Sequence, residues 1–180
     1  MLQMLIRNGT CVNPSGAFQA DIAISEGTIV AIGRKLDLPA ENTIDASDKL
    51  VLPGLVDTHV HMPWPSGDLD SVDDLDAGTA AAVCGGVTSV VEYVVPDESG
   101  RILPPLDARL KQVAGATHCD YGAHLILRKV TAETLDEMAI ACKRGFTSFK
   151  IYTAYEGFCL SDTEMLQAMD RATQLDAVVC

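Results

Sequence analysis

The sequence predicts an α/β protein, the first half of a (β/α)8 barrel preceded by part of a small antiparallel β-sandwich. Two observations lead to this fold class. Residues 1–52 consist of short strand patterns separated by turn-forming residues, whereas residues 53–180 alternate apolar strand-like runs with longer helix-like stretches. The pattern changes at Pro53-Gly54, a turn-forming pair, so we place the boundary between two domains there.

Residues 1–52 are expected to form small strands that pair in antiparallel fashion. Turn formers such as Asn8-Gly9 and Glu26-Gly27 follow the apolar runs and are predicted to end the strands. The expected strands cover residues 5–7, 21–25, 28–32, 42–45 and 50–52. This part of the chain therefore reads as a portion of a small sandwich.

Residues 53–180 are expected to repeat a strand and a helix. Thr131 and Ser161 each stand where a helix N-cap is expected, and Gly145 follows the end of the third helix-like stretch. The expected strands cover residues 56–60, 87–95, 121–127, 146–152 and a fifth that begins at 177, and the expected helices cover residues 72–84, 104–113, 131–143 and 161–174.

This alternation permits either a doubly wound sheet or a barrel. The glycine-rich G-x-G-x-x-G turn of dinucleotide-binding doubly wound sheets does not follow the first strand. A whole barrel needs about 250 residues. Residues 53–180 would supply about half of one and stop in strand 5, so we expect a chain that is truncated relative to the complete barrel.

The charge balance excludes two classes of partner. Lys and Arg number 13 against 25 Asp and Glu, and the net charge of -12 disfavours binding to nucleic acid or to anionic membranes. No apolar segment is long enough for a signal peptide or a spanning helix. The six cysteines form no C-x-x-C pair, which favours buried reduced thiols over a zinc knuckle or disulfides. We therefore expect a cytoplasmic protein.

The strongest chemical signal is Asp57-Thr58-His59-Val60-His61, at the end of the first barrel-like strand. Alternate side chains of a strand share one face, so His59 and His61 should point the same way. Two such imidazoles suit Zn²⁺ or a similar divalent ion, and functional groups of barrels gather at the carboxyl ends of strands. The alternative is a pair of hydrogen-bonded histidines without a metal.

The second signal is Lys150, a cation within the strand-like segment 147–152. An unpaired ammonium is costly to bury, so the side chain could reach solvent or pair with Glu92. Lysine also loses its proton readily when desolvated. The neutral amine can then add CO₂ to form a carbamate, an anionic ligand with two oxygens. The residues alone do not decide between these states.

Four segments carry a resemblance to a known family. They are Leu52-Pro-Gly-Leu-Val-Asp-Thr-His-Val-His61, Ala82-Val-Cys-Gly-Gly-Val-Thr-Ser89, Asp120-Tyr-Gly-Ala-His124 and Thr147-Ser-Phe-Lys-Ile-Tyr-Thr-Ala-Tyr155. Together they resemble the cyclic amidohydrolases of the hydantoinase and dihydropyrimidinase type, over nearly the whole chain. The P-G-x-x-D-x-H-x-H pattern is typical of the wider amidohydrolase superfamily, and S-F-K with a tyrosine five residues after the lysine favours the hydantoinase branch over dihydroorotases.

The resemblance implies a site with two divalent metal ions. Zinc is the expected metal, and manganese is the alternative. His59 and His61 would bind the more buried ion, and carboxylated Lys150 would bridge both. Tyr155 would donate a hydrogen bond to the developing oxyanion, so Lys150 and Tyr155 are the expected catalytic residues. The family's remaining histidines and its catalytic aspartate would follow Cys180, and we therefore expect residues 1–180 alone to be inactive.

The implied function of the parent protein is metal-dependent ring opening of a small cyclic amide such as a hydantoin or a dihydropyrimidine, by a homotetramer. An allantoinase-like enzyme is one alternative. A non-catalytic oligomeric scaffold is another, although such relatives typically lose metal ligands that this chain keeps. His124 is expected to be a hydrogen-bonded core histidine, and the loop 62–67 with Trp64 could line the substrate entrance, before an acidic run from Asp68.

Overall fold

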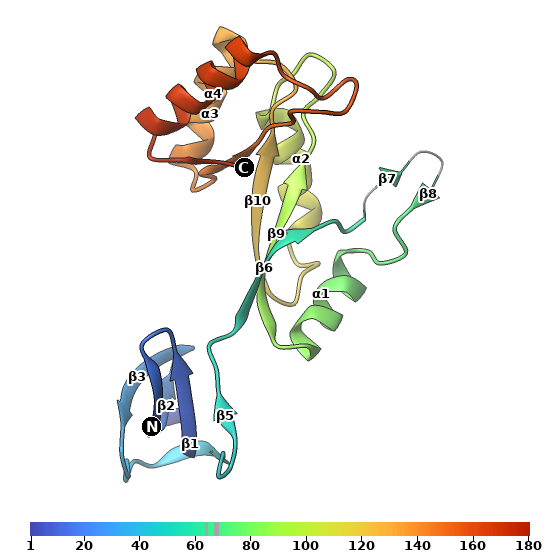
Figure 1. Ribbon diagram of the computed structural model, residues 1–180. Coiled ribbons are helices and arrows are strands. Elements are labelled where there is room, and N and C mark those ends of the chain that lie inside the picture. The colour runs from blue at the N-terminus through green and yellow to red at the C-terminus, as the bar shows by residue number, and fades with distance from the viewer. Residues whose placement is uncertain (64, 67–68) are drawn as a thin grey trace. The chain divides into compact units, whose positions relative to one another are not determined.

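The computed structural model describes residues 1–63, 65–66 and 69–180, which form two compact units, Met1–Pro53 and Gly54–Cys180 (Figure 1). The expectations for Trp64, Gly67 and Asp68 lie outside the described residues. Among the helices that are described, none is long and apolar enough to cross a membrane.

The first unit is a mixed sheet with strand order β3-β2-β1-β4, in which β5 also pairs with β1. Short turns join β1, β2 and β3 as antiparallel neighbours, whereas β4 and β5 both run parallel to β1. The parallel pairs were not predicted, because turn signals reveal only the pairing of consecutive strands. The strands are β1 (Leu2–Asn13), β2 (Gly16–Ser25), β3 (Thr28–Gly33), β4 (Ala40–Asp45) and β5 (Leu50–Val51).

Asn8-Gly9 does not end the first strand, and the prediction of a turn there is wrong. The two residues lie inside β1 at a register shift between Ile6 and Gly9, which is a β-bulge. Asn8 has a φ of 63°, the left-handed conformation that asparagine tolerates better than most residues. Its backbone N–H donates to the buried carboxylate of Asp21 at 2.8 Å, so the strand continues without an unsatisfied donor.

The described residues of the second unit form a five-stranded parallel sheet whose order, β12-β11-β10-β9-β6, follows the chain. The strands are β6 (Leu55–Val60), β9 (Val87–Val94), β10 (Asp120–Ile126), β11 (Ser148–Lys150) and β12 (Val178–Val179). Figure 1 shows β6, β9 and β10 side by side. A doubly wound sheet reverses its strand order at a switch point, whereas a barrel does not, so this order is that of a barrel.

A helix connects each parallel strand to the next. The helices are α1 (Leu75–Cys84), α2 (Leu103–Val113), α3 (Ala132–Lys143) and α4 (Asp162–Gln174), and a hairpin of β7 (Pro65–Ser66) and β8 (Leu69–Asp70) precedes α1. The predicted caps at Thr131 and Ser161 are confirmed, the second as a full capping box with Glu164. α1 begins three residues later than predicted, because Asp74 caps it through Ala77 N at 2.9 Å.

The core of this unit lies between the strands and α2, α3 and α4. Its buried members are Val94, Ile102, Leu106, Ala123, Leu125, Leu127, Met138, Ala141, Phe149, Leu160, Ala168 and Ala172. Successive side chains of a strand point to opposite faces. Tyr93, His124 and Lys150 each neighbour a core residue along their strand, and they therefore point to the other face of the sheet.

The cysteines are only partly as predicted. Cys11 is buried and no cysteine is in a disulfide, but Cys84, Cys159 and Cys180 are exposed. These three thiols stand at the end of a helix, in a loop and just after a strand, rather than on a core-facing position. Apolar neighbours along the sequence were therefore a poor guide to their burial.

Candidate active site

The two histidines of the H-x-H pattern stand where β6 ends. β6 pairs with β9 through Asp57 and Val90, then shifts register, and pairs again through Val60 and Glu92. The backbone N–H of His59 donates to the carboxylate of Asp57 at 3.0 Å across this irregularity. The ring centroids of His59 and His61 are 5.3 Å apart, with the planes at 76°. Both rings line one cavity, so they share a face as strand parity predicts.

Tyr93 on β9 packs against both imidazoles. Its hydroxyl lies 3.1 Å from Nδ1 of His59, and its ring stacks on His61 with centroids 5.1 Å apart and planes at 24°. Burial raises the pKa of the Tyr93 phenol, so it keeps its proton. The sequence patterns did not lead to a prediction for Tyr93. The available signal was its place near the carboxyl end of the strand that pairs with the histidine strand.

The protonation of His61 suits a ligand. Burial, followed by the charge of the neighbouring His59, lowers the pKa of His61, and the charge of Glu92 raises it by less. The neutral imidazole is therefore favoured, which is the form that binds metal ions.

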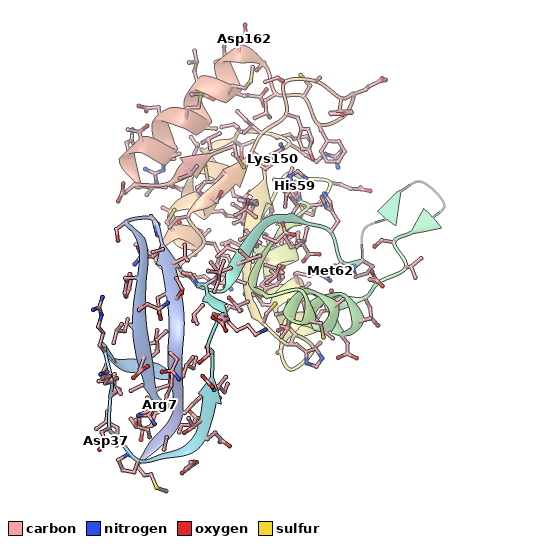
Figure 2. The ribbon with its side chains drawn as sticks, turned by 60° about the horizontal axis from the view of Figure 1, so that its bottom comes forward. Arg7, Asp37, His59, Met62, Lys150 and Asp162 are labelled. Atoms are coloured by element: carbon pink, nitrogen blue, oxygen red, sulfur yellow. The ribbon has the colours of Figure 1, made fainter. Side chains whose placement is uncertain are left out.

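Lys150 ends β11 and points into the same cavity. Its Nζ lies 5.9 Å from the ring centroid of Tyr93 and 5.1 Å from that of Tyr152. Figure 2 shows Lys150 and His59 close together. The alternative pairing of Lys150 with Glu92 is wrong, because Glu92 is on the opposite face of β9 from Tyr93 and binds Arg109.

Tyr155 lies in the segment between β11 and α4, at the mouth of the cavity. Its side chain is 76% exposed, and its φ of 76° is unusual for a bulky residue. The Tyr155 carbonyl accepts hydrogen bonds from the backbone N–H groups of Phe158 and Cys159, at 3.1 and 3.0 Å. These bonds join the carbonyl of Tyr155 to the turn that follows it, and an unusual backbone conformation of this kind is often found in functional segments.

The cavity has a volume of about 580 Å³, within the range of small-molecule sites. Its lining residues are His59, His61, Tyr93, Lys150, Tyr152, Tyr155, Glu156 and Phe158. Sequence analysis named the two histidines, the lysine and Tyr155, and the structure brings all of them to this cavity. Within residues 1–63, 65–66 and 69–180, no group of three His, Cys, Asp or Glu side chains is placed to hold a metal ion.

His124 neighbours the site and is hydrogen-bonded, as predicted, but it is half-buried on the face of the sheet away from the core, so its expected place in the core is wrong. Its Nδ1 lies 2.6 Å from the hydroxyl of Ser148, and its Nε2 lies 3.0 Å from the carbonyl oxygen of Thr58. Its ring also packs against Tyr93, with centroids 4.9 Å apart. Both ring nitrogens are thus occupied, which indicates a structural histidine that supports the strand of His59.

The fold and the cavity define a barrel-type α/β protein with a pocket of histidine, lysine and tyrosine side chains at the carboxyl ends of its parallel strands. The chain belongs to the dihydro-orotase-like family, whose model matches residues 48–180.

The relatives agree with this assignment. A dihydropyrimidinase of Dictyostelium discoideum is 37% identical over 179 residues, which cover 97% of this chain and 35% of the relative. A D-hydantoinase of Ralstonia pickettii is 36% identical over 180 residues, covering 99% and 39% of the two chains. The crystal structure of the dihydropyrimidinase from Brevibacillus agri NCHU1002 superimposes with a TM-score of 0.92 at 32% identity, covering 98% and 39%.

These matches confirm the predicted fold class and the resemblance to hydantoinases and dihydropyrimidinases. The chain spans 35% to 39% of the length of the relatives described.

Proposed function

We propose that the protein hydrolyses a ring amide of a small cyclic substrate, a hydantoin or a dihydropyrimidine, with the help of two divalent metal ions. One observation carries this proposal: His59, His61, Lys150 and Tyr155 line a single cavity at the carboxyl ends of parallel strands. The names of the relatives, D-hydantoinase and dihydropyrimidinase, support the class of substrate.

The donor set fits a metal ion of the zinc type. His59 and His61 would hold one ion through their imidazole nitrogens, and Lys150 as a carbamate would be shared between two ions. Zinc is the metal we propose, with manganese as the alternative. Such ions lower the pKa of water and polarise a carbonyl when they are bound.

The chain's own residues orient the ligands and the substrate. When Nδ1–H of His59 donates to the Tyr93 oxygen, the lone pair of Nε2 is left for the metal, which is a common arrangement of ligand histidines. Tyr155 would donate a hydrogen bond from its hydroxyl group to the oxyanion that develops on the attacked carbonyl. Its anchored backbone limits the positions that this hydroxyl can take.

The test uses the full-length protein, assayed for metal content and for ring opening of hydantoin, dihydrouracil and allantoin. Lys150→Ala should lose metal and activity together, with partial rescue by short carboxylic acids. Lys111→Ala, a lysine of α2 that does not line the cavity, is the matched control and should keep both. Full activity of Lys150→Ala would contradict the bridging role, and metal-loaded protein that opens none of the three rings would refute the proposed reaction.

We further propose a cytoplasmic homotetramer, and that residues 1–180 alone are inactive. The unpaired cysteines, three of them exposed, suit a reducing compartment. The described residues contain no triad of His, Cys, Asp or Glu that could complete a metal site. Light scattering of the full-length protein measures the mass of the assembly directly.

A further inference from the structure

A buried carboxylate, that of Glu92, lies on β9 at the position that pairs with Val60, the residue between the two histidines. Glu92 is 2% exposed, and a buried charge is costly unless partners compensate for it. Its oxygens accept from Nε of Arg109 at 2.7 Å, from the hydroxyl of Tyr121 at 2.7 Å and from the backbone N–H of Met62 at 3.1 Å. Nη2 of Arg109 also donates both to Glu92 and to the carbonyl oxygen of Met62. The ion pair therefore binds both backbone groups of Met62.

The contact at Met62 lies next to a metal ligand that we propose, His61. Met62 directly follows His61, where the β6–β9 register has already ended at the pair Val60 and Glu92. The register is also irregular between Asp57 and Val60, around His59. Sheet pairing is thus interrupted at Thr58 and His59, resumes at Val60 and ends before His61 and Met62. Beyond Val60, the side chains of Glu92 and Arg109 bind the backbone of Met62 in place of a neighbouring strand.

We propose that Glu92 and Arg109 are positioning residues, which clamp the backbone after His61 and so keep the His59 and His61 imidazoles at the spacing that a metal ion requires. This inference rests on the proposed metal centre. Arginine suits the task because its planar fork can reach a carboxylate and a carbonyl at once. Burial would lower the pKa of Arg109, but the hydrogen bond and charge of Glu92 raise it overall, so Arg109 keeps its charge.

A second buried carboxylate in the same unit provides a matched control. Glu137 is 3% exposed, and it accepts from Nε of Arg101 at 2.9 Å and from the backbone N–H groups of Ile102 and Leu103 at 2.7 and 3.2 Å. It therefore combines an arginine with backbone donors just as Glu92 does. The backbone that it holds is the start of α2, and none of these residues lines the candidate active site.

The experiment compares Glu92→Gln with Glu137→Gln in the full-length protein, by zinc titration and by amide hydrogen exchange of the metal-free form. Because partners beyond the ligands of a metal site affect its affinity about 10- to 100-fold, Glu92→Gln should weaken zinc binding by that factor. It should also speed exchange in residues 59–62. Glu137→Gln should speed exchange at the start of α2 and leave zinc affinity unchanged.

A double variant separates positioning from stability. Glu92→Gln leaves a buried arginine without its charge partner and could prevent folding, whereas replacing both members of a buried ion pair by apolar residues is often neutral. Glu92→Leu with Arg109→Met should therefore melt near the wild type, yet bind zinc as weakly as the single variant.

Wild-type zinc affinity and unchanged exchange in residues 59–62 of the double variant would overturn the inference. If the wild-type protein bound no zinc, the proposed metal centre would fail, and the exchange data would still show whether the ion pair holds the histidine segment.

Discussion

The hydroxyl of Tyr93 should strengthen metal binding without being a ligand. Tyr93→Phe removes one oxygen atom, which lies 3.1 Å from Nδ1 of His59, and keeps the ring that packs against both histidines. A neutral hydrogen bond contributes about 0.5–1.5 kcal/mol. Since about 1.4 kcal/mol corresponds to a tenfold change, the zinc dissociation constant should rise by roughly 2- to 10-fold. The physical reason is that His59 then loses the partner that fixes its tautomer and its ring orientation.

Competition with a chromophoric chelator measures this change in the full-length protein. Tyr152→Phe is the matched control, because Tyr152 lines the same cavity and the contacts described for it are ring contacts with Tyr155, Phe158 and Lys150. We expect that control to bind zinc like the wild type. Equal zinc affinity of Tyr93→Phe and the wild type, or an equal loss in both variants, would refute the role of the hydroxyl.

Further predictions concern stability and the activity of the isolated chain. Leu106→Ala in the core, at 0% exposure, should lower the free energy of unfolding by about 2–5 kcal/mol in urea titrations, whereas Leu166→Ala, at 67% exposure, should change it by less than about 0.5 kcal/mol. Asp21 accepts hydrogen bonds from two backbone N–H groups at 2.8 Å, and the bond from Asn8 is the largest cause that lowers its pKa below the ordinary 3.8. The ionised Asp21 carboxylate therefore contributes its full stabilisation above pH 3.8, and this contribution is lost as the pH falls through the lowered pKa. In thermal melts, Asp21→Asn should be less stable than the wild type at neutral pH, and the difference should shrink in acid. Residues 1–180 purified alone should not open hydantoin or dihydrouracil even with zinc and bicarbonate, and turnover abolished by His59→Ala would contradict this.

The starts of α3 and α4 and the common face of the two histidines could be predicted because their signals are local. The N-caps at Thr131 and Ser161 act within one turn of helix, and the common face of His59 and His61 follows from the two-residue period of a strand. Such features need only the nearest neighbours along the chain. The strand and helix pattern of residues 53–180 was accordingly close to the observed one.

Other features depend on partners far away in the sequence. Asn8-Gly9 reads as a turn, but the carboxylate of Asp21 and the pairing with β2 make it a bulge inside a long strand. The sequence pattern identified two residues that tolerate unusual backbone conformations, but it did not show that they lie inside a strand. Sequence patterns show that a backbone conformation is available, and long-range hydrogen bonds select how it is used.

Around the histidines, too, local signals could be predicted from the sequence and long-range contacts could not. The residue types and the spacing around His59 and His61 led to the prediction of a metal site, and the structure places both rings together at the end of a strand. The choice of Arg109 rather than Lys150 as the partner of Glu92, and the contact of Tyr93 with His59, emerged only in the folded chain. A buried charge takes the partner that packing brings within reach, and that depends on which face of β9 meets α2 and which meets the cavity.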